Sequence, residues 1–225
     1  MCMKGWLKGK ISKEAILVLV LAFVLNMGSY YGSRAIAINW YHYDVTTPLD
    51  GEFPLIPWTV TIYFGCYLFW GVNYFLCAVQ EKGPRNRYFC ADAIAKITCF
   101  VIFLVFPTTA ARPWIDTSGF WGYFMGLLYQ VDSADNLFPS LHCLVSWLCW
   151  IGVRKRKDIP AVYRWASLVM ALAVCVTTLT TKQHVIVDVV GGVALAELSY
   201  FLAGFSKVCA VYDWVLTKLL RLFRK

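Results

Sequence analysis

Two histidines, His142 and His184, stand at the edges of apolar segments, where their chemistry could be used. His184 precedes Asp188 by four residues, so on a helix the carboxylate shares a face with the imidazole and can approach one ring nitrogen. Such a contact fixes the tautomer and leaves the other nitrogen as a nucleophile or base. The spacing therefore predicts a catalytic histidine that is oriented by a carboxylate.

His142 follows a short segment that favours the start of a helix. Ser140, directly after Pro139, can cap a helix whose first backbone N–H groups, including that of Leu141, have no partner within the helix. These N–H groups and the positive end of the helix dipole favour an anion such as phosphate. The alternatives are a plain serine N-cap and a histidine that only packs between helices.

The composition places these residues in a membrane protein. Of the 225 residues, 60% are hydrophobic and 17% aromatic, and the mean hydropathy of +0.60 lies outside the range of soluble domains. A net charge of +8 would suit nucleic-acid binding, but the basic residues flank apolar runs and form no stripe with interleaved aromatics. The sequence therefore predicts the lipid bilayer as a partner and argues against nucleic acid.

Six apolar segments predict an all-α protein with six transmembrane helices. A spanning helix needs about 20 apolar residues at a rise of about 1.5 Å per residue. The predicted spans are residues 14–36, 55–79, 89–111, 139–153, 161–181 and 184–205, and we interpret residues 1–206 as one membrane domain. Residues 207–225 have apolar side chains at helical spacing and a basic end, which predicts an amphipathic helix along the cytoplasmic surface.

The basic residues predict the topology, because cytoplasmic loops carry an excess of Lys and Arg. One side receives Lys4, Lys8, Lys10, Lys13, Lys82, Arg85, Arg87, Arg154, Lys155, Arg156, Lys157, Arg164, Lys207, Lys218, Arg221, Arg224 and Lys225. The other side receives Arg34, Arg112 and Lys182. This division predicts cytoplasmic termini and puts both histidine clusters at the outer face of the membrane. We expect this membrane to be the plasma membrane.

Two charged residues, Asp92 and Lys96, fall within the third predicted span. They are four residues apart near its cytoplasmic start, so we expect an ion pair along the helix with the lysine snorkelling toward the headgroups.

The site residues resemble the motifs of the type 2 phosphatidic acid phosphatase superfamily of membrane phosphatases, which are KxxxxxxRP, PSGH and SRxxxxxHxxxD. The matching residues are Arg112-Pro113 for the first motif, Pro139-Ser140-Leu141-His142 for the second, and His184 with Asp188 for the third. The resemblance covers roughly residues 105–195. A further resemblance, to the branch that includes inositol phosphorylceramide synthases, is carried by Asp50, Pro54, Pro57 and Trp58.

Some family positions hold other residues here. The family Lys falls on Val105, the Gly on Leu141, and the Ser-Arg pair on Thr177 and Thr178. Two phosphate-binding cations are therefore missing from their family positions. Lys182 and Arg34, the other outer-face cations, are predicted replacements, and the alternative is that each only snorkels to the interface.

By this resemblance, His184 attacks phosphorus, Asp188 orients it, and His142 protonates the leaving oxygen. Arg112, the Ser140 hydroxyl and the backbone N–H groups at Leu141 would stabilise the phosphoryl oxygens, with Lys182 and Arg34 as further cations. The resemblance implies no cofactor, and the carboxylates and cysteines show no metal-binding pattern.

These residues predict a lipid phosphatase that passes the phosphoryl group to water. Candidate substrates are phosphatidic acid, phosphatidylglycerophosphate and a polyprenyl diphosphate. A close alternative is a transferase whose acceptor is a lipid alcohol such as ceramide or diacylglycerol. From another class, a non-catalytic transporter or scaffold remains open, although a transport path favours polar residues at the bilayer midplane, whereas this sequence concentrates them at one interface.

Overall fold

The computed structural model describes residues 12–222, and its first helical span begins at Lys13. The Ser12 side chain caps this helix by accepting a hydrogen bond from the backbone N–H of Ala15 at 3.1 Å. Helix α1 (Lys13–Met27) continues through the π-helical turn η2 (Gly28–Gly32) into α2 (Ser33–Ala37). Together they form one candidate span of 25 residues, Lys13–Ala37, where the sequence predicts a span over residues 14–36.

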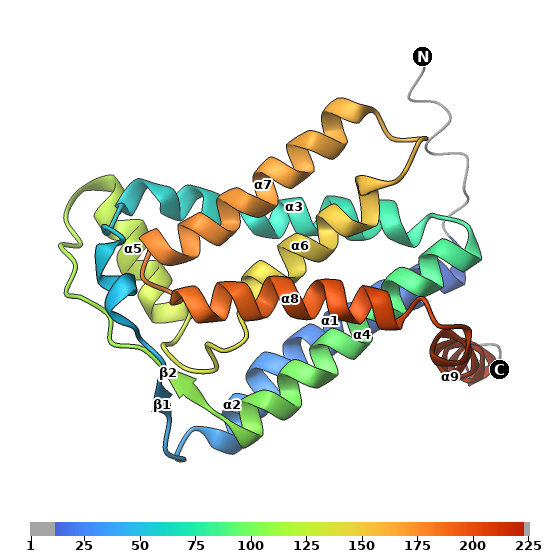
Figure 1. The fold of residues 1–225 in the computed structure, drawn as a ribbon, viewed down its shortest axis with the longest axis horizontal. Coiled ribbons are helices and arrows are strands. Elements are labelled where there is room, and N and C mark those ends of the chain that lie inside the picture. Colours follow the sequence, from blue (N-terminus) through green and yellow to red (C-terminus); the bar gives the residue numbers. More distant parts are fainter. Residues whose placement is uncertain (1–11, 223–225) are drawn as a thin grey trace.

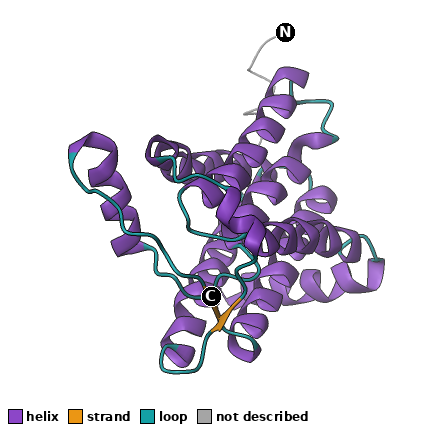
Figure 2. Cartoon of the chain, turned by 60° about the vertical axis from the view of Figure 1, so that its left-hand side comes forward, coloured by secondary structure: helices purple, strands orange, loops and turns teal. Residues whose placement is uncertain are grey.

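The remaining elements form a helical bundle with a small cap at one end (Figure 1). They are β1 (Tyr43–Asp44), η3 (Pro48–Glu52), η4 (Pro57–Thr59), α3 (Val60–Ala78), α4 (Lys82–Val105), β2 (Thr108–Thr109), α5 (Gly119–Val131), α6 (Leu141–Arg154), α7 (Ala161–Thr180), α8 (Ile186–Leu202) and α9 (Ser206–Leu222). Figure 2 shows that the described chain is helical apart from loops and the short parallel pair β1–β2. In Figure 1 the strands and α5 lie at the end opposite α9.

The helices identify an all-α membrane protein, with four to five candidate spans by length and composition. Four stretches qualify alone: Lys13–Ala37, Pro57–Ala78, Lys82–Val105 and Ala161–Thr180. Helices α8 and α9 qualify only as a pair, and they meet at an angle of 89°. Helix α6, with 14 residues, is shorter. Six spans, cytoplasmic termini and the surface position of α9 remain predictions.

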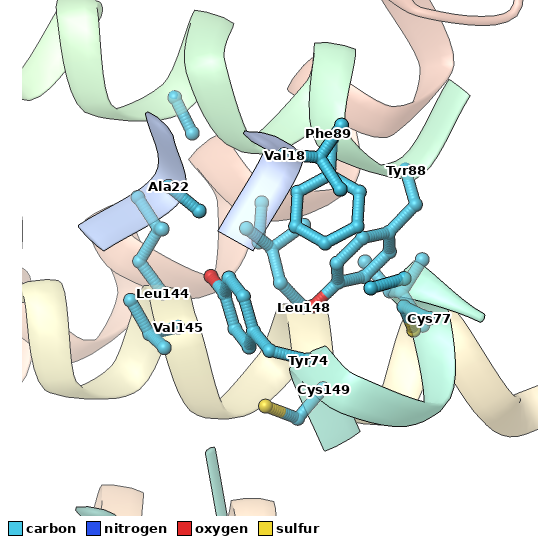
Figure 3. Packing of buried hydrophobic residues seen from close by; sticks show 14 of the residues in the cluster. Val18, Ala22, Tyr74, Cys77, Tyr88, Phe89, Leu144, Val145, Leu148 and Cys149 are labelled. Carbon is cyan, nitrogen blue, oxygen red and sulfur yellow. The ribbon is translucent and has the colours of Figure 1, made fainter. Parts of the chain in front are cut away.

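Aromatic side chains hold the end of α3 and the start of α4 together. Figure 3 shows Tyr74 of α3 with Tyr88 and Phe89 of α4, close to Val18 of α1 and Leu148 of α6. The Tyr88 and Phe89 rings meet edge to face with centroids 5.1 Å apart. Lipid tails are as apolar as these side chains, so close packing supplies the stability that the hydrophobic effect supplies in water. This packing fixes α1, α3, α4 and α6 relative to one another.

The charged pair in α4 is buried more deeply than the sequence predicts. Lys96 Nζ lies 2.9 Å from an Asp92 carboxylate oxygen, which confirms the ion pair. The lysine does not snorkel, however, because only 2% of its side chain is exposed and its ammonium donates to the Ala22 carbonyl at 3.0 Å. The helix begins at Lys82, seven residues earlier than predicted, which puts the pair well inside the bundle.

The loop before α6 contains a helix that the sequence analysis missed. Helix α5 begins at Gly119, whose φ of +71° is accessible to glycine at little cost. Its buried residues Met125 and Leu128 pack against Val60 and Tyr63 at the start of α3. This contact carries the end of α5 back over the bundle, to the side where the two histidines lie.

Candidate active site

His184 and Asp188 lie at the start of α8 and make the contact that their spacing predicts. His184 Nδ1 is 3.3 Å from Asp188 Oδ2, and the same oxygen accepts a hydrogen bond from the Val185 N–H at 3.0 Å. The Asp188 side chain is fully buried and 7% of the His184 side chain is exposed. The tautomer that donates from Nδ1 leaves Nε2 with a lone pair. This arrangement leaves Nε2 of His184 able to act as a nucleophile or base.

A tight turn between α7 and α8 positions His184. The Thr178 carbonyl accepts hydrogen bonds from the N–H groups of Gln183 at 2.9 Å and His184 at 3.1 Å. Lys182, between them and α7, has a φ of +57°, a conformation that is uncommon for a residue with a Cβ. The hydroxyls of Thr177 and Thr178 both donate to backbone carbonyls. The two threonines in the family's Ser-Arg positions therefore maintain the local backbone.

The start of α6 is held directly against α8. The Ser140 N–H donates to the Asp188 carbonyl at 3.0 Å, and the Ser140 hydroxyl accepts from the Cys143 N–H at 3.3 Å, as an N-cap does. Gly192 allows this approach, because a Cβ there would lie 2.5 Å from the Ser140 carbonyl oxygen. Helix α6 begins at Leu141 beside the turn that positions His184, with His142 in its first turn.

The two histidines face a common cavity. Their ring centroids are 6.0 Å apart, and both rings line a cavity of about 340 Å³, which we call the catalytic cavity. Leu141, Asp132 and Gln183 also line it. A phosphoryl group that is to meet both rings at the reacting distance of about 3–3.5 Å would have to lie in this shared space. The geometry brings together the residues that the separate motifs predict.

Asp132 is a site residue that the sequence analysis missed. Its Oδ2 atom lies 4.0 Å from His142 Nε2 and accepts a hydrogen bond from the Tyr63 hydroxyl, which is itself 3.2 Å from His142 Nδ1. Tyr30 donates to Oδ1 at 2.7 Å. Burial raises the pKa of Asp132, but the adjacent His142 and the two tyrosine hydroxyls lower it by more, so the carboxyl is ionised at neutral pH. His142 therefore has a carboxylate neighbour of its own.

Arg112 contacts the lining of the catalytic cavity through Gln183. Its guanidinium donates to Gln183 Oε1 at 2.6 Å and to the Asp132 carbonyl at 2.6 Å, and it lies over the Tyr129 ring at 4.9 Å. Two buried donors, Arg112 Nε and Gln183 Nε2, have no acceptor among residues 12–222. An unsatisfied buried donor is costly, so these two nitrogens are candidates for binding an anionic oxygen. Gln183 carried no motif signal, only its position beside His184.

The other two predicted cations occupy different places. Lys182 donates from Nζ to the carbonyls of Asp50 at 3.1 Å and Phe53 at 2.5 Å. Arg34 donates to Asp135 at 2.7 Å. Lys182, but not Arg34, lines a second cavity of about 380 Å³ together with Arg112, and we call it the basic cavity. Among the described residues, His184 alone lines both the basic and the catalytic cavity.

Asp50 lines the basic cavity and holds two backbone segments together through its carboxylate. One carboxylate oxygen accepts the Ile186 N–H at 2.7 Å, and the other accepts the N–H of Thr47 at 2.7 Å. Asp50 thereby joins η3 to the first residue of α8. Val105, at the family's Lys position, is 73% exposed and lines neither the catalytic nor the basic cavity. Within the described chain, no group of three or more His, Cys, Asp or Glu side chains is placed to hold a metal ion.

The fold and the site together define a helical membrane protein with two facing histidines, one of them bonded to a carboxylate. The family model of the PAP2 superfamily matches residues 34–202, and the chain belongs to this superfamily of phosphatases. No curated protein and no solved structure that was compared with the chain matches it. Membership confirms the resemblance that the motifs indicate and identifies a phosphatase-type enzyme, a lipid phosphatase or a related phosphotransferase.

Proposed function

We propose that this protein hydrolyses a lipid phosphate through a phosphohistidine at the outer face of its membrane. The observation that carries the proposal is the facing pair His142 and His184, 6.0 Å apart between ring centroids, with Asp188 on one ring and Asp132 beside the other. A nucleophile with its orienting carboxylate and a separate proton donor across a cavity are the groups that phosphoryl transfer through an enzyme nucleophile requires.

In the first step, His184 Nε2 attacks phosphorus while Asp188 holds the ring through Nδ1. The N–P bond forms as the bond between phosphorus and the lipid oxygen breaks. His142, in its protonated form beside Asp132, gives its proton to that leaving oxygen. The products of this step are the lipid alcohol and phosphorylated His184.

Negative charge is distributed over the phosphoryl oxygens during the transfer, and the site has several hydrogen-bond donors that could stabilise it. Arg112 Nε and Gln183 Nε2 are buried donors without an acceptor in the described part of the chain, so they are the best candidates for an oxyanion-binding site. The backbone N–H groups at the start of α6, at Leu141 and its neighbours, and the Ser140 hydroxyl add to them. Lys182 contributes positive charge from the basic cavity.

In the second step, water attacks the phosphohistidine, neutral His142 takes one of its protons, and the N–P bond breaks to release phosphate. A lipid alcohol in place of water would make the protein a transferase. The position of Asp50 favours this second candidate. Asp50 is one of the residues that resemble the inositol phosphorylceramide synthase branch, and it lines the basic cavity together with His184.

The outer-face orientation is supported by the distribution of charges over the bundle. The starts of α6 and α8, which carry the histidines, lie at the end of the bundle that holds α5 and the strand pair (Figure 1). The basic residues Arg85, Arg154 and Arg156 belong to the loops and helix ends near the other end. Basic residues of membrane proteins are enriched on the cytoplasmic side, and this supports an outward-facing site.

Incubation of the purified protein with a panel of lipid phosphates tests the reaction. We expect inorganic phosphate to be released without any added acceptor, because water is the acceptor in the proposed second step. A product that forms only when ceramide or diacylglycerol is present would identify the transferase. No turnover under either condition, with substrates of several headgroup classes, would contradict both enzymatic proposals.

Asp132→Asn should lower kcat/KM by about 10- to 100-fold, because a carboxylate beside His142 stabilises the protonated ring that acts as general acid. With the carboxylate gone, the alkaline limb of the pH–rate profile should move to lower pH. Tyr30→Phe is the matched control, since it removes a hydrogen bond to the same carboxylate but leaves the charge in place. A profile of unchanged shape in Asp132→Asn would show that Asp132 only supports the fold.

A further inference from the structure

A third cavity adjoins the catalytic cavity between α1 and α3. It has a volume of about 310 Å³, and we call it the α1–α3 groove. Asn26, Met27, Tyr67 and Trp70 line both the groove and the catalytic cavity, so the two spaces meet along a common wall. The groove extends from there along the two helices to Lys96. It therefore leads from the histidines toward the interior of the bilayer.

The α1–α3 groove is open to the surrounding lipid. Phe23 on one wall and Tyr67 on the other are 64% and 50% exposed, and Gly71 beside Tyr67 leaves the wall without a side chain. On a membrane-spanning helix the exposed side chains face lipid tails. A lipid can therefore enter the groove from the side, without leaving the bilayer.

Asn26 indicates that the groove is more than a packing gap. Its Oδ1 atom is buried and accepts no hydrogen bond from residues 12–222, and its side chain lines both spaces. A polar side chain without a partner in a membrane helix is costly and marks a functional position by default. An amide both donates and accepts, so it matches the ester, amide or hydroxyl groups that join the phosphate of a lipid to its tail.

We propose that the α1–α3 groove binds the hydrocarbon tail of the lipid phosphate whose headgroup lies between His142 and His184. Asn26 then contacts the polar linkage where the groove meets the catalytic cavity. A tail that moves from lipid into an apolar groove changes little in solvation, so the groove adds little affinity. Its contribution is to hold the phosphate in line with His184 Nε2. This inference rests on the proposed function and specifies how its substrate is oriented.

Gly71→Leu tests the groove directly, because a Cβ at Gly71 would meet no atom within 4 Å and the side chain enters open space. We expect kcat/KM for a long-tailed lipid phosphate to fall by about tenfold or more, while a short-tailed soluble analogue changes less than about twofold. Val72→Leu is the matched control. It adds bulk at the next residue, which is 43% exposed and outside the groove, and neither substrate should be affected.

Unchanged turnover of the long-tailed substrate in Gly71→Leu would overturn the proposal, as would an equal loss for both substrates. A parent protein that hydrolyses neither substrate would count against the proposed function, and photolabelling then decides the groove by itself. A lipid phosphate with a diazirine in its tail should label Met27 or Trp70, and Gly71→Leu should suppress that labelling. Equal labelling by phosphatidylcholine with the same tail would show that bulk lipid occupies the groove, and would also overturn the proposal.

Discussion

His184→Gln should reduce kcat by at least about 1000-fold, which corresponds to a loss of about 4 kcal/mol of transition-state stabilisation. The substitution removes the nucleophilic nitrogen of the proposed mechanism and leaves a polar side chain near Asp188. The protein should remain folded, because His184 lies in a turn at the edge of the cavity and not in the aromatic core. Release of phosphate from a lipid phosphate, with parent and variant at equal concentration, measures the effect.

His142→Gln provides the matched comparison. It removes the proposed general acid but not the nucleophile, so its defect should shrink when the lipid alcohol is replaced by nitrophenol, which leaves without a proton. His184→Gln should be inactive on both substrates. A labelled phosphoenzyme trapped in the parent should map to His184. Activity of His184→Gln within tenfold of the parent would rule out His184 as the nucleophile.

Arg112→Met should lower kcat/KM by about 100-fold or more, because a cation near the transferring phosphoryl group can contribute several kcal/mol in a partly dehydrated site. Arg112 donates to Gln183, so the substitution also releases the amide that lines the catalytic cavity. Steady-state kinetics with one lipid phosphate measures the loss. Gln183→Met separates the two effects, because it deletes the amide and leaves the guanidinium charge.

Lys182→Met, measured beside Arg112→Met, shows whether one cation or two bind the phosphate. If Lys182 replaces the missing family arginine, its loss should approach 100-fold, and Lys182→Arg should recover part of it. If its ammonium serves only the carbonyls of Asp50 and Phe53, the Met variant should stay within about threefold of the parent. A large effect at Arg112 with none at Lys182 would contradict the predicted replacement.

The parts of the site that follow from local sequence could be predicted. The four-residue spacing of His184 and Asp188 is found as a contact of 3.3 Å, and Ser140 caps the helix that begins at Leu141. Helical geometry alone dictates such contacts, because residues four apart share a face. The apolar segments likewise predicted the helices, although α6 is shorter than a span and α4 begins earlier than expected.

The parts that depend on contacts between distant segments could not be predicted. Asp132 lies near His142 because α5 packs against α3. Neither the type nor the spacing of these residues in the sequence predicts the proximity of Asp132 to His142. Lys182 lines the same cavity as His184, but its ammonium donates to two carbonyls more than a hundred residues earlier in the chain. Gly192 allows α6 to pack closely against α8. This contact could not be predicted either, because a glycine within a helix does not indicate which segment packs against it.

The buried pair in α4 bears on how the protein is made. An isolated Lys or Asp at the centre of a membrane helix opposes insertion by about 2.5–3.5 kcal/mol on the scale of the translocation machinery. The partners of this pair come from segments that are synthesised earlier, the Ala22 carbonyl from α1 and the Tyr74 hydroxyl from α3. Helix α4 therefore enters the membrane when both partners have already left the ribosome. The order of the segments along the chain suits biogenesis as well as the finished bundle.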